Sequence, residues 1–173
     1  MKILRNAGLV IGIIMLVTIS SQAQRKASTP EERAQAVKVA RLLETDPFHK
    51  EAKKMRQWFT LWLIEVPDIS VELCGSYLGP VGGSDKNYSS EIFTQMGFSS
   101  AAFKIEHPDQ ANDRVAANLA GVEGALKVYE SILTTKPKVK SEFLDGLVEK
   151  RNKGELRAYV EEVTTAKSNN KKV

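Results

Sequence analysis

Apolar side chains recur at alternating spacings of four and three residues along two long segments of this chain. In the first segment the series is Val115, Leu119, Val122, Leu126, Tyr129 and Leu133. In the second segment it is Phe48, Ala52, Met55, Phe59, Trp62 and Val66. Because an α-helix has 3.6 residues per turn, each series falls on one helix face. Both segments are therefore predicted to be amphipathic helices that pack on a common core.

Start and stop signals place the first two helices. Thr29-Pro30-Glu31-Glu32 has the spacing of a capping box and predicts a helix over residues 30–44. Asp46-Pro47 repeats the start signal for a second helix, which Pro67 ends. Apolar residues surround the second half of that helix, including Trp58, Leu61, Leu63 and Ile64. A helix that is apolar all round is expected at the centre of its domain.

Four further helices are expected in the second half of the chain. Ser89 or Ser90 caps one that ends at His107-Pro108, and Asp113 begins the next. In that next helix, Gly121 and Gly124 are expected to allow close packing, against the face that carries Gly97. Two shorter helices are predicted over residues 139–151 and 155–166.

Residues 69–88 are harder to assign. A short helix over residues 70–78 is predicted, with an extended conformation as the open alternative, because Ile69 and Val71 favour a strand. Residues 79–88 are rich in glycine and proline and are expected to form an irregular loop. Together these segments predict an all-α fold, a compact single-domain bundle of six or seven helices over residues 30–166. A disordered basic tail is expected over residues 167–173.

The first 23 residues have the order of parts of a secretory signal peptide. Lys2 and Arg5 precede an apolar stretch over residues 7–20, and Ser21-Gln22-Ala23 supplies small residues for cleavage. The apolar stretch of about 14 residues is shorter than the roughly 20 needed to cross a bilayer. Cleavage after Ala23 is therefore expected. It would leave a short basic segment over residues 24–29, a periplasmic or secreted product, and no stable membrane span.

Charge and cysteine content narrow the possible partners. The net charge of +4 is modest, and two of the basic residues lie in the predicted signal peptide. Nucleic-acid binding is therefore not expected. The chain has one cysteine, Cys74, so it cannot form an intramolecular disulfide. Apolar neighbours favour a buried thiol at Cys74, while a reactive thiol or an intermolecular disulfide stays open.

No residue pattern predicts catalysis, a metal or a cofactor. Gly79, Gly82, Gly83 and Lys86 lack the spacing of a phosphate-binding loop. His49 is expected on the surface. His107 lies at a helix junction without an apparent set of metal ligands. We therefore expect a binding protein and not an enzyme; its oligomeric state stays open.

Two candidate binding sites remain. The first is the end of the glycine-rich loop, where Asp85, Lys86, Asn87 and Tyr88 offer charge, amide and an aromatic ring to an exported or envelope protein. The alternative is a pocket for a small apolar ligand between helices, lined by Trp58, Trp62 and Tyr77.

Overall fold

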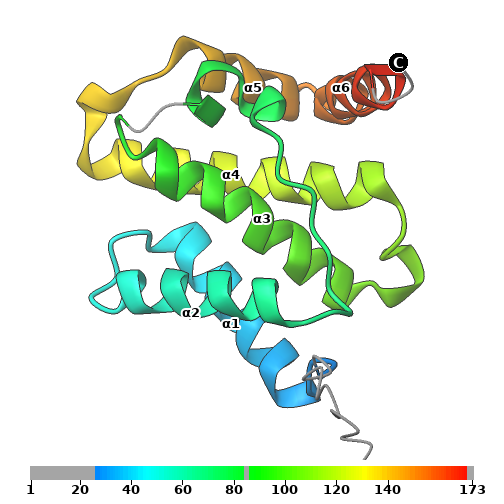
Figure 1. Ribbon diagram of the computed structural model, residues 1–173. Coiled ribbons are helices and arrows are strands. Elements are labelled where there is room, and N and C mark those ends of the chain that lie inside the picture. Colours follow the sequence, from blue (N-terminus) through cyan, green and yellow to red (C-terminus); the bar gives the residue numbers. More distant parts are fainter. Residues whose placement is uncertain (1–25, 84–85, 171–173) are drawn as a thin grey trace, which may run out of the picture.

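The structure is a computed structural model that describes residues 26–83 and 86–170, with side chains as far as residue 166. Within these ranges the chain forms six α-helices and three 3-10 helices and contains no strand (Figure 1). The predicted all-α fold is confirmed. The predicted signal peptide over residues 1–23 lies outside the described residues.

The α-helices are α1 (Pro30–Thr45), α2 (Ala52–Glu65), α3 (Ser89–Glu106), α4 (Arg114–Thr135), α5 (Glu142–Asn152) and α6 (Leu156–Asn170). The 3-10 helices are η1 (Gly75–Gly83), η2 (Pro108–Gln110) and η3 (Pro137–Val139).

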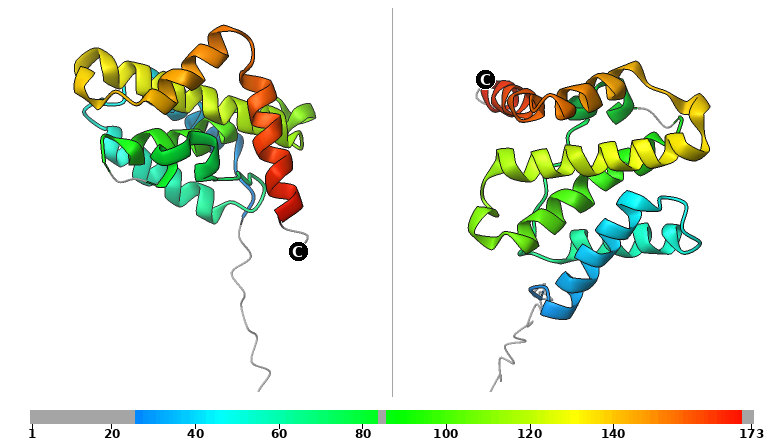
Figure 2. Two further views of the ribbon diagram at one scale, coloured as in Figure 1. Left: turned by 90° about the horizontal axis from the view of Figure 1, so that it is seen from above. Right: turned by 180° about the vertical axis from the view of Figure 1, so that it is seen from behind.

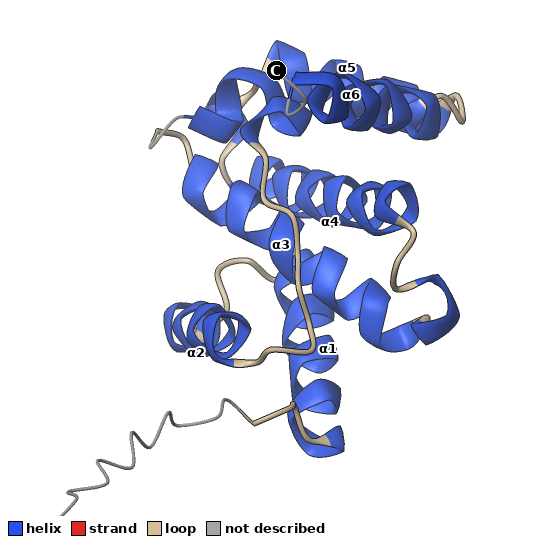
Figure 3. Ribbon diagram, turned by 45° about the vertical axis from the view of Figure 1, so that its right-hand side comes forward, coloured by secondary structure: helices blue, strands red, loops and turns tan. Residues whose placement is uncertain are grey.

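The helices form three layers (Figure 1, Figure 2). The long helices α3 and α4 form the middle layer and pack extensively on each other. On one side lie α1 and α2, and on the other lie α5, α6 and η1. Residues 66–74 connect the two outer layers by running past α3 (Figure 3).

Two apolar cores separate the three layers. The larger core joins α3 and α4 to η1, α5 and α6, and includes Tyr77, Leu126 and Val160. The smaller core joins α1 and α2 to α3. In the smaller core the rings of Phe59 and Phe98 stack with centroids 4.2 Å apart and planes 3° apart. Burial of these apolar side chains is the main stabilising contribution to the fold.

Local capping explains where α1 and α4 begin. The Thr29 hydroxyl accepts a hydrogen bond from the Glu32 amide (3.2 Å), and the Glu32 carboxylate accepts one from the Thr29 amide (2.8 Å). The predicted capping box is thus confirmed. The Asp113 carboxylate accepts from the amides of Val115 and Ala116, which satisfies the first turn of α4.

Glycines bring α4 very close to α3. A Cβ at Gly121 would lie 2.7 Å from the carbonyl oxygen of Met96, and a Cβ at Gly124 would lie 1.9 Å from Ser99 Oγ. The prediction of close packing at these glycines is confirmed. The expected partner helix is confirmed as well, because Gly121 meets Met96 and Ser100 and Gly124 meets Ser99, all on α3. Gly97 itself is not part of this contact, since it faces the side chain of Leu73.

A buried carboxylate ties the three helices α1, α3 and α4 together. Glu44 is only 3% exposed. Its Oε1 accepts hydrogen bonds from Ser99 Oγ (2.8 Å) and Arg41 Nη1 (2.6 Å), and its Oε2 accepts one from Lys127 Nζ (3.0 Å). Buried charges are tolerated when they are paired and hydrogen-bonded in this way.

The predicted position of α2 was wrong in two respects. The helix begins at Ala52 and not at the Asp46-Pro47 signal. The Asp46 amide instead closes α1 by donating to the Leu42 carbonyl (2.8 Å), and residues 47–51 form a turn between the two helices. The helix also lies in an outer layer and not at the centre. Leu61 and Ile64 are 51% and 60% exposed. The all-round apolar pattern therefore marks an exposed apolar surface.

The segment before α3 also differs from the prediction. Residues 66–74 have no regular secondary structure, so the predicted helix over residues 70–78 is wrong for its first half. The 3-10 helix η1 then covers residues predicted as irregular loop, and it kinks at Gly79. Cys74, expected to be buried, is half-buried and packs against the larger core.

Two helix ends differ as well. The residue before α3 is Tyr88 and makes no side-chain cap, whereas Ser89 or Ser90 was predicted to cap this helix. At the other end of the chain, α6 continues to Asn170. The tail predicted to be disordered from residue 167 is therefore helical over its first four residues, and residues 171–173 lie outside the described part.

Candidate functional site

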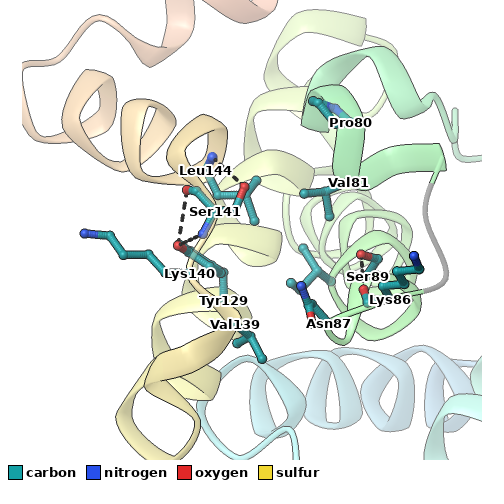
Figure 4. Close-up of a pocket in the computed structure, with 11 residues that line it drawn as sticks. Pro80, Val81, Lys86, Asn87, Ser89, Tyr129, Val139, Lys140, Ser141 and Leu144 are labelled. Atoms are coloured by element: carbon teal, nitrogen blue, oxygen red, sulfur yellow. Dashed lines mark hydrogen bonds between the residues drawn. The ribbon is translucent and has the colours of Figure 1, made fainter.

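A pocket of about 210 Å³ lies where η1, the start of α3 and the connection from α4 to α5 meet (Figure 4). We call it the loop pocket. Its lining residues are Pro80, Val81, Lys86, Asn87, Ser89, Ile92, Tyr129, Val139, Lys140, Ser141 and Leu144. Two of the predicted partner-binding residues, Lys86 and Asn87, are among them. Tyr88 is next to them in the chain, and Asp85 lies outside the described residues.

The first wall of the loop pocket depends on Gly79. This residue has φ 54° and ψ −133°, a backbone conformation that residues with a Cβ avoid. A Cβ at Gly79 would also lie 2.7 Å from three atoms of the Phe143 ring. Glycine therefore lets the chain turn sharply beneath Phe143, which places Pro80 and Val81 along the pocket.

At the second wall, the lining residue Asn87 and the next residue, Tyr88, both have left-handed backbone conformations. Asn87 has φ 52° and Tyr88 has φ 62°. Asparagine adopts this conformation fairly often, but an aromatic residue does so rarely. The Ser89 amide and hydroxyl both donate to the Lys86 carbonyl, and the Ile92 amide donates to the Tyr88 carbonyl (3.0 Å). These bonds hold the turn at the first residues of α3.

An exposed aromatic edge lies beside this turn. The ring of Tyr88 meets the ring of Phe48 edge to face, with centroids 5.2 Å apart and planes 74° apart. Phe48, from the turn between α1 and α2, is 42% exposed. Phe48 is thus an exposed aromatic side chain beside a half-buried one, Tyr88.

Tyr129 of α4 fixes the opposite wall. Its hydroxyl accepts a hydrogen bond from the Ser141 amide (2.8 Å) and donates to Asp145 Oδ1 (2.8 Å). Burial raises the pKa of Tyr129 to about 12, and the carboxylate of Asp145 acts in the same direction. The phenol is therefore neutral near pH 7 and holds the start of α5 against α4.

The residues predicted to line an apolar-ligand pocket do not come together. Trp58 and Trp62 stack with ring centroids 6.0 Å apart, within the smaller core. Tyr77 is fully buried in the larger core. Its hydroxyl accepts a hydrogen bond from Asn118 Nδ2 (2.8 Å) and lies 2.9 Å from Thr164 Oγ1. These three side chains therefore do not form one pocket.

A different apolar pocket lies between α2, the connection over residues 66–74, and α3. We call it the α2–α3 groove. Its volume is about 330 Å³, and its lining is Thr60, Leu63, Ile64, Val71, Leu73, Phe93, Thr94, Gly97 and Phe98. Sequence reasoning missed this groove because it assigned Leu63 and Ile64 to a central helix. The apolar residues all round α2 were the available signal.

The described residues contain no group of three or more His, Cys, Asp or Glu side chains that could hold a metal ion. His107 ends α3, and its ring lies 4.7 Å from the ring of Phe103. His49 Nδ1 accepts a hydrogen bond from the Glu51 amide (3.2 Å). No helix in the described part of the chain is both long and apolar enough for a membrane span.

No family model matches the chain, and neither a curated protein nor a solved structure matches it.

Proposed function

We propose that this chain is an exported binding protein, and not an enzyme, that docks a segment of another exported or envelope protein at the loop pocket. The observation that carries the proposal is the turn at Asn87 and Tyr88. Two consecutive non-glycine residues in left-handed conformations cost about 1–3 kcal/mol each. Such strain concentrates at binding sites, and here it borders a pocket with an exposed aromatic edge.

The size and floor of the loop pocket favour a protein partner over a small molecule. Small-molecule sites generally enclose about 300–1,000 Å³, and this pocket is smaller, at about 210 Å³. Its floor is formed by Ile92 and Leu144, which are 2% and 1% exposed. A recess of this kind suits one apolar anchor side chain of a partner, with the surrounding surface contacting the rest of the segment.

Site-specific photo-crosslinking tests the proposal. A photoreactive residue is placed at Asn87, and in a separate control at Lys38, an exposed residue of α1 outside the pocket lining. We expect the probe at position 87 to capture a discrete partner in the native host. A second change, Val139→Trp, fills the pocket and should abolish that crosslink. Equal capture from both positions, or capture unaffected by Val139→Trp, would contradict the proposal.

The proposed export rests on residues 1–23 alone. Mass spectrometry of the native protein from its own host measures the first residue directly. Cleavage after Ala23 predicts a chain that begins at Gln24 in the periplasmic or extracellular fraction. A chain that begins at Met1 would contradict the signal peptide, and the binding proposal would then concern a cytoplasmic or anchored protein.

A second candidate function is binding of a small apolar ligand in the α2–α3 groove. Two observations favour it: the groove volume of about 330 Å³ lies within the range of ligand sites, and its lining contains no charged side chain. Native mass spectrometry of the purified protein should then detect an added mass. Ile64→Glu, at a 60% exposed position, should remove that mass, while Leu61→Glu outside the lining should not.

A further inference from the structure

We infer that the segment docked at the loop pocket is acidic and carries an apolar anchor residue. This inference rests on the proposed function of the same site and adds the chemistry of the partner. Lys86 and Lys140 line the pocket on opposite sides (Figure 4). Both side chains are exposed. A segment that crosses the pocket would therefore pass between two positive charges.

The connection from α4 to α5 adds to this positive rim. Residues 136–140 read Lys-Pro-Lys-Val-Lys, and Lys136 and Lys138 are exposed on either side of Pro137. Val139, between the last two lysines, is half-buried and lines the pocket. This connection thus presents ammonium groups to solvent and an apolar side chain to the recess.

The residues that line the pocket include two lysines and no acidic side chain. Asp145 Oδ1 accepts the hydrogen bond from Tyr129, and Asp145 Oδ2 lies 3.5 Å from Lys140 Nζ across an exposed pair. Glu142, in the first turn of α5, is exposed and does not line the pocket. Complementary negative charge on the partner would be attracted to a lining that carries lysine side chains and no carboxylate.

The floor of the recess requires an apolar group on the same molecule. Ile92 and Leu144 close the floor, and Val81 and Val139 flank it. An acidic polypeptide segment with one projecting Leu, Ile or Phe meets both requirements, because its backbone spaces carboxylates on both sides of the anchor. A membrane surface offers the negative charge but no single projecting side chain, so we commit to the peptide.

Selection of random 12-residue peptides on the immobilised full-length mature chain tests this inference. We expect the enriched peptides to carry a net negative charge around one apolar residue. Their affinity should fall about tenfold or more in the double variant Lys86→Glu/Lys140→Glu and should weaken with added salt. The matched control Lys38→Glu/Lys150→Glu changes the net charge by the same amount, at exposed positions outside the pocket lining. It should bind the peptides as the wild type does.

The outcomes separate this inference from the function on which it rests. Neutral or basic peptides that compete with the crosslink at position 87 would overturn the acidic partner and leave the docking function standing. The inference is also wrong if no peptide is enriched, or if both double variants bind equally. Vesicles of phosphatidylglycerol are the last arm. Suppose that the chain binds these vesicles, that the variant Lys86→Glu/Lys140→Glu does not, and that the selection enriches no peptide. This result would assign the rim to a membrane and overturn the inference.

Discussion

The hydroxyl oxygen of Ser99 occupies the space into which any side chain at Gly124 would grow. A Cβ at Gly124 would lie 1.9 Å from Ser99 Oγ and 2.4 Å from Ser99 Cβ. This contact sets the separation of α3 and α4. Because α3 contributes Ile92 to the loop pocket and Phe98 to the α2–α3 groove, the same contact fixes the position of both candidate sites.

Gly124→Ala is expected to lower the free energy of unfolding by about 1–3 kcal/mol, because the added methyl group overpacks the interface of α3 and α4. Gly146→Ala is the matched control. A Cβ at Gly146 meets nothing within 4 Å, so the better helix propensity of alanine should raise stability, by up to about 1 kcal/mol. Urea denaturation measures both values. Equal stabilisation by the two substitutions would show that α3 and α4 are not in contact at this point.

Glu44→Gln is expected to lower the free energy of unfolding by about 1–3 kcal/mol. The substitution removes the charge that accepts hydrogen bonds from Arg41 and Lys127 while keeping the shape of the side chain. Glu161→Gln serves as control, because Glu161 is 52% exposed and pairs with Arg157 at the surface. The control should change stability by less than about 0.5 kcal/mol. A cost at Glu44 no larger than the control would mean that the carboxylate is not buried among its partners.

Asp68 should make the stability depend on pH below about 4. Burial raises the pKa of Asp68, but hydrogen bonds from the Ser28 amide (2.9 Å), the Ser28 hydroxyl (2.7 Å) and Arg33 (2.6 Å) outweigh it and bring the pKa to about 2. Because the folded pKa is lower than the unfolded value of 3.8, the stabilisation is complete above pH 4. It is lost as the pH falls from about 4 to about 2.

Asp68→Asn tests that dependence. The variant should be less stable than the wild type by about 1 kcal/mol at pH 7, after solvent screening is allowed for, and the difference should shrink as the pH falls through this range. Asp109→Asn, at an exposed position of η2, provides the same change in charge. A constant difference between wild type and Asp68→Asn from pH 7 to pH 2 would show that the hydrogen bonds to Asp68 do not favour its charged form.

Tyr129→Phe should loosen the wall of the loop pocket. Loss of the hydroxyl removes the acceptor for the Ser141 amide and the donor to Asp145, and a lost hydrogen bond of this kind costs about 1 kcal/mol. We expect faster amide hydrogen exchange over residues 139–145. Tyr159→Phe loses a hydroxyl that donates to the Tyr77 carbonyl (3.1 Å) and should leave that exchange unchanged. Faster exchange there in both variants would point to a general loss of stability.

The sequence predicts local structure well where the interaction involves only residues that are close together in the chain. Thr29 and Glu32 marked the start of α1 because a capping box involves neighbouring residues alone. Gly121 and Gly124 indicated a close approach, but the partner surface depended on how α3 is rotated, which no local pattern encodes. Leu61 and Ile64 were assigned to the domain centre because an apolar pattern does not distinguish a buried helix from an exposed apolar face.

The sequence predicts only part of the candidate site, because a local pattern does not encode how distant segments pack together. Lys86 and Asn87 lie in the predicted loop, and both line the loop pocket. Val139 and Lys140 lie more than 50 positions later and carry no local signal for the site, since their proximity to the loop arises from the packing of α4 against α3. Trp58 and Tyr77 were grouped by residue type, yet they belong to different cores.

The proposed docking at the loop pocket is tested most directly by amide hydrogen exchange of the chain alone and in complex with the partner captured at position 87. The account predicts that bound partner slows exchange over residues 80–83 and 86–92 and over residues 137–145, which together carry the lining of the loop pocket apart from Tyr129. Protection confined to residues 60–73 and 93–98 would instead place the partner in the α2–α3 groove and contradict the account.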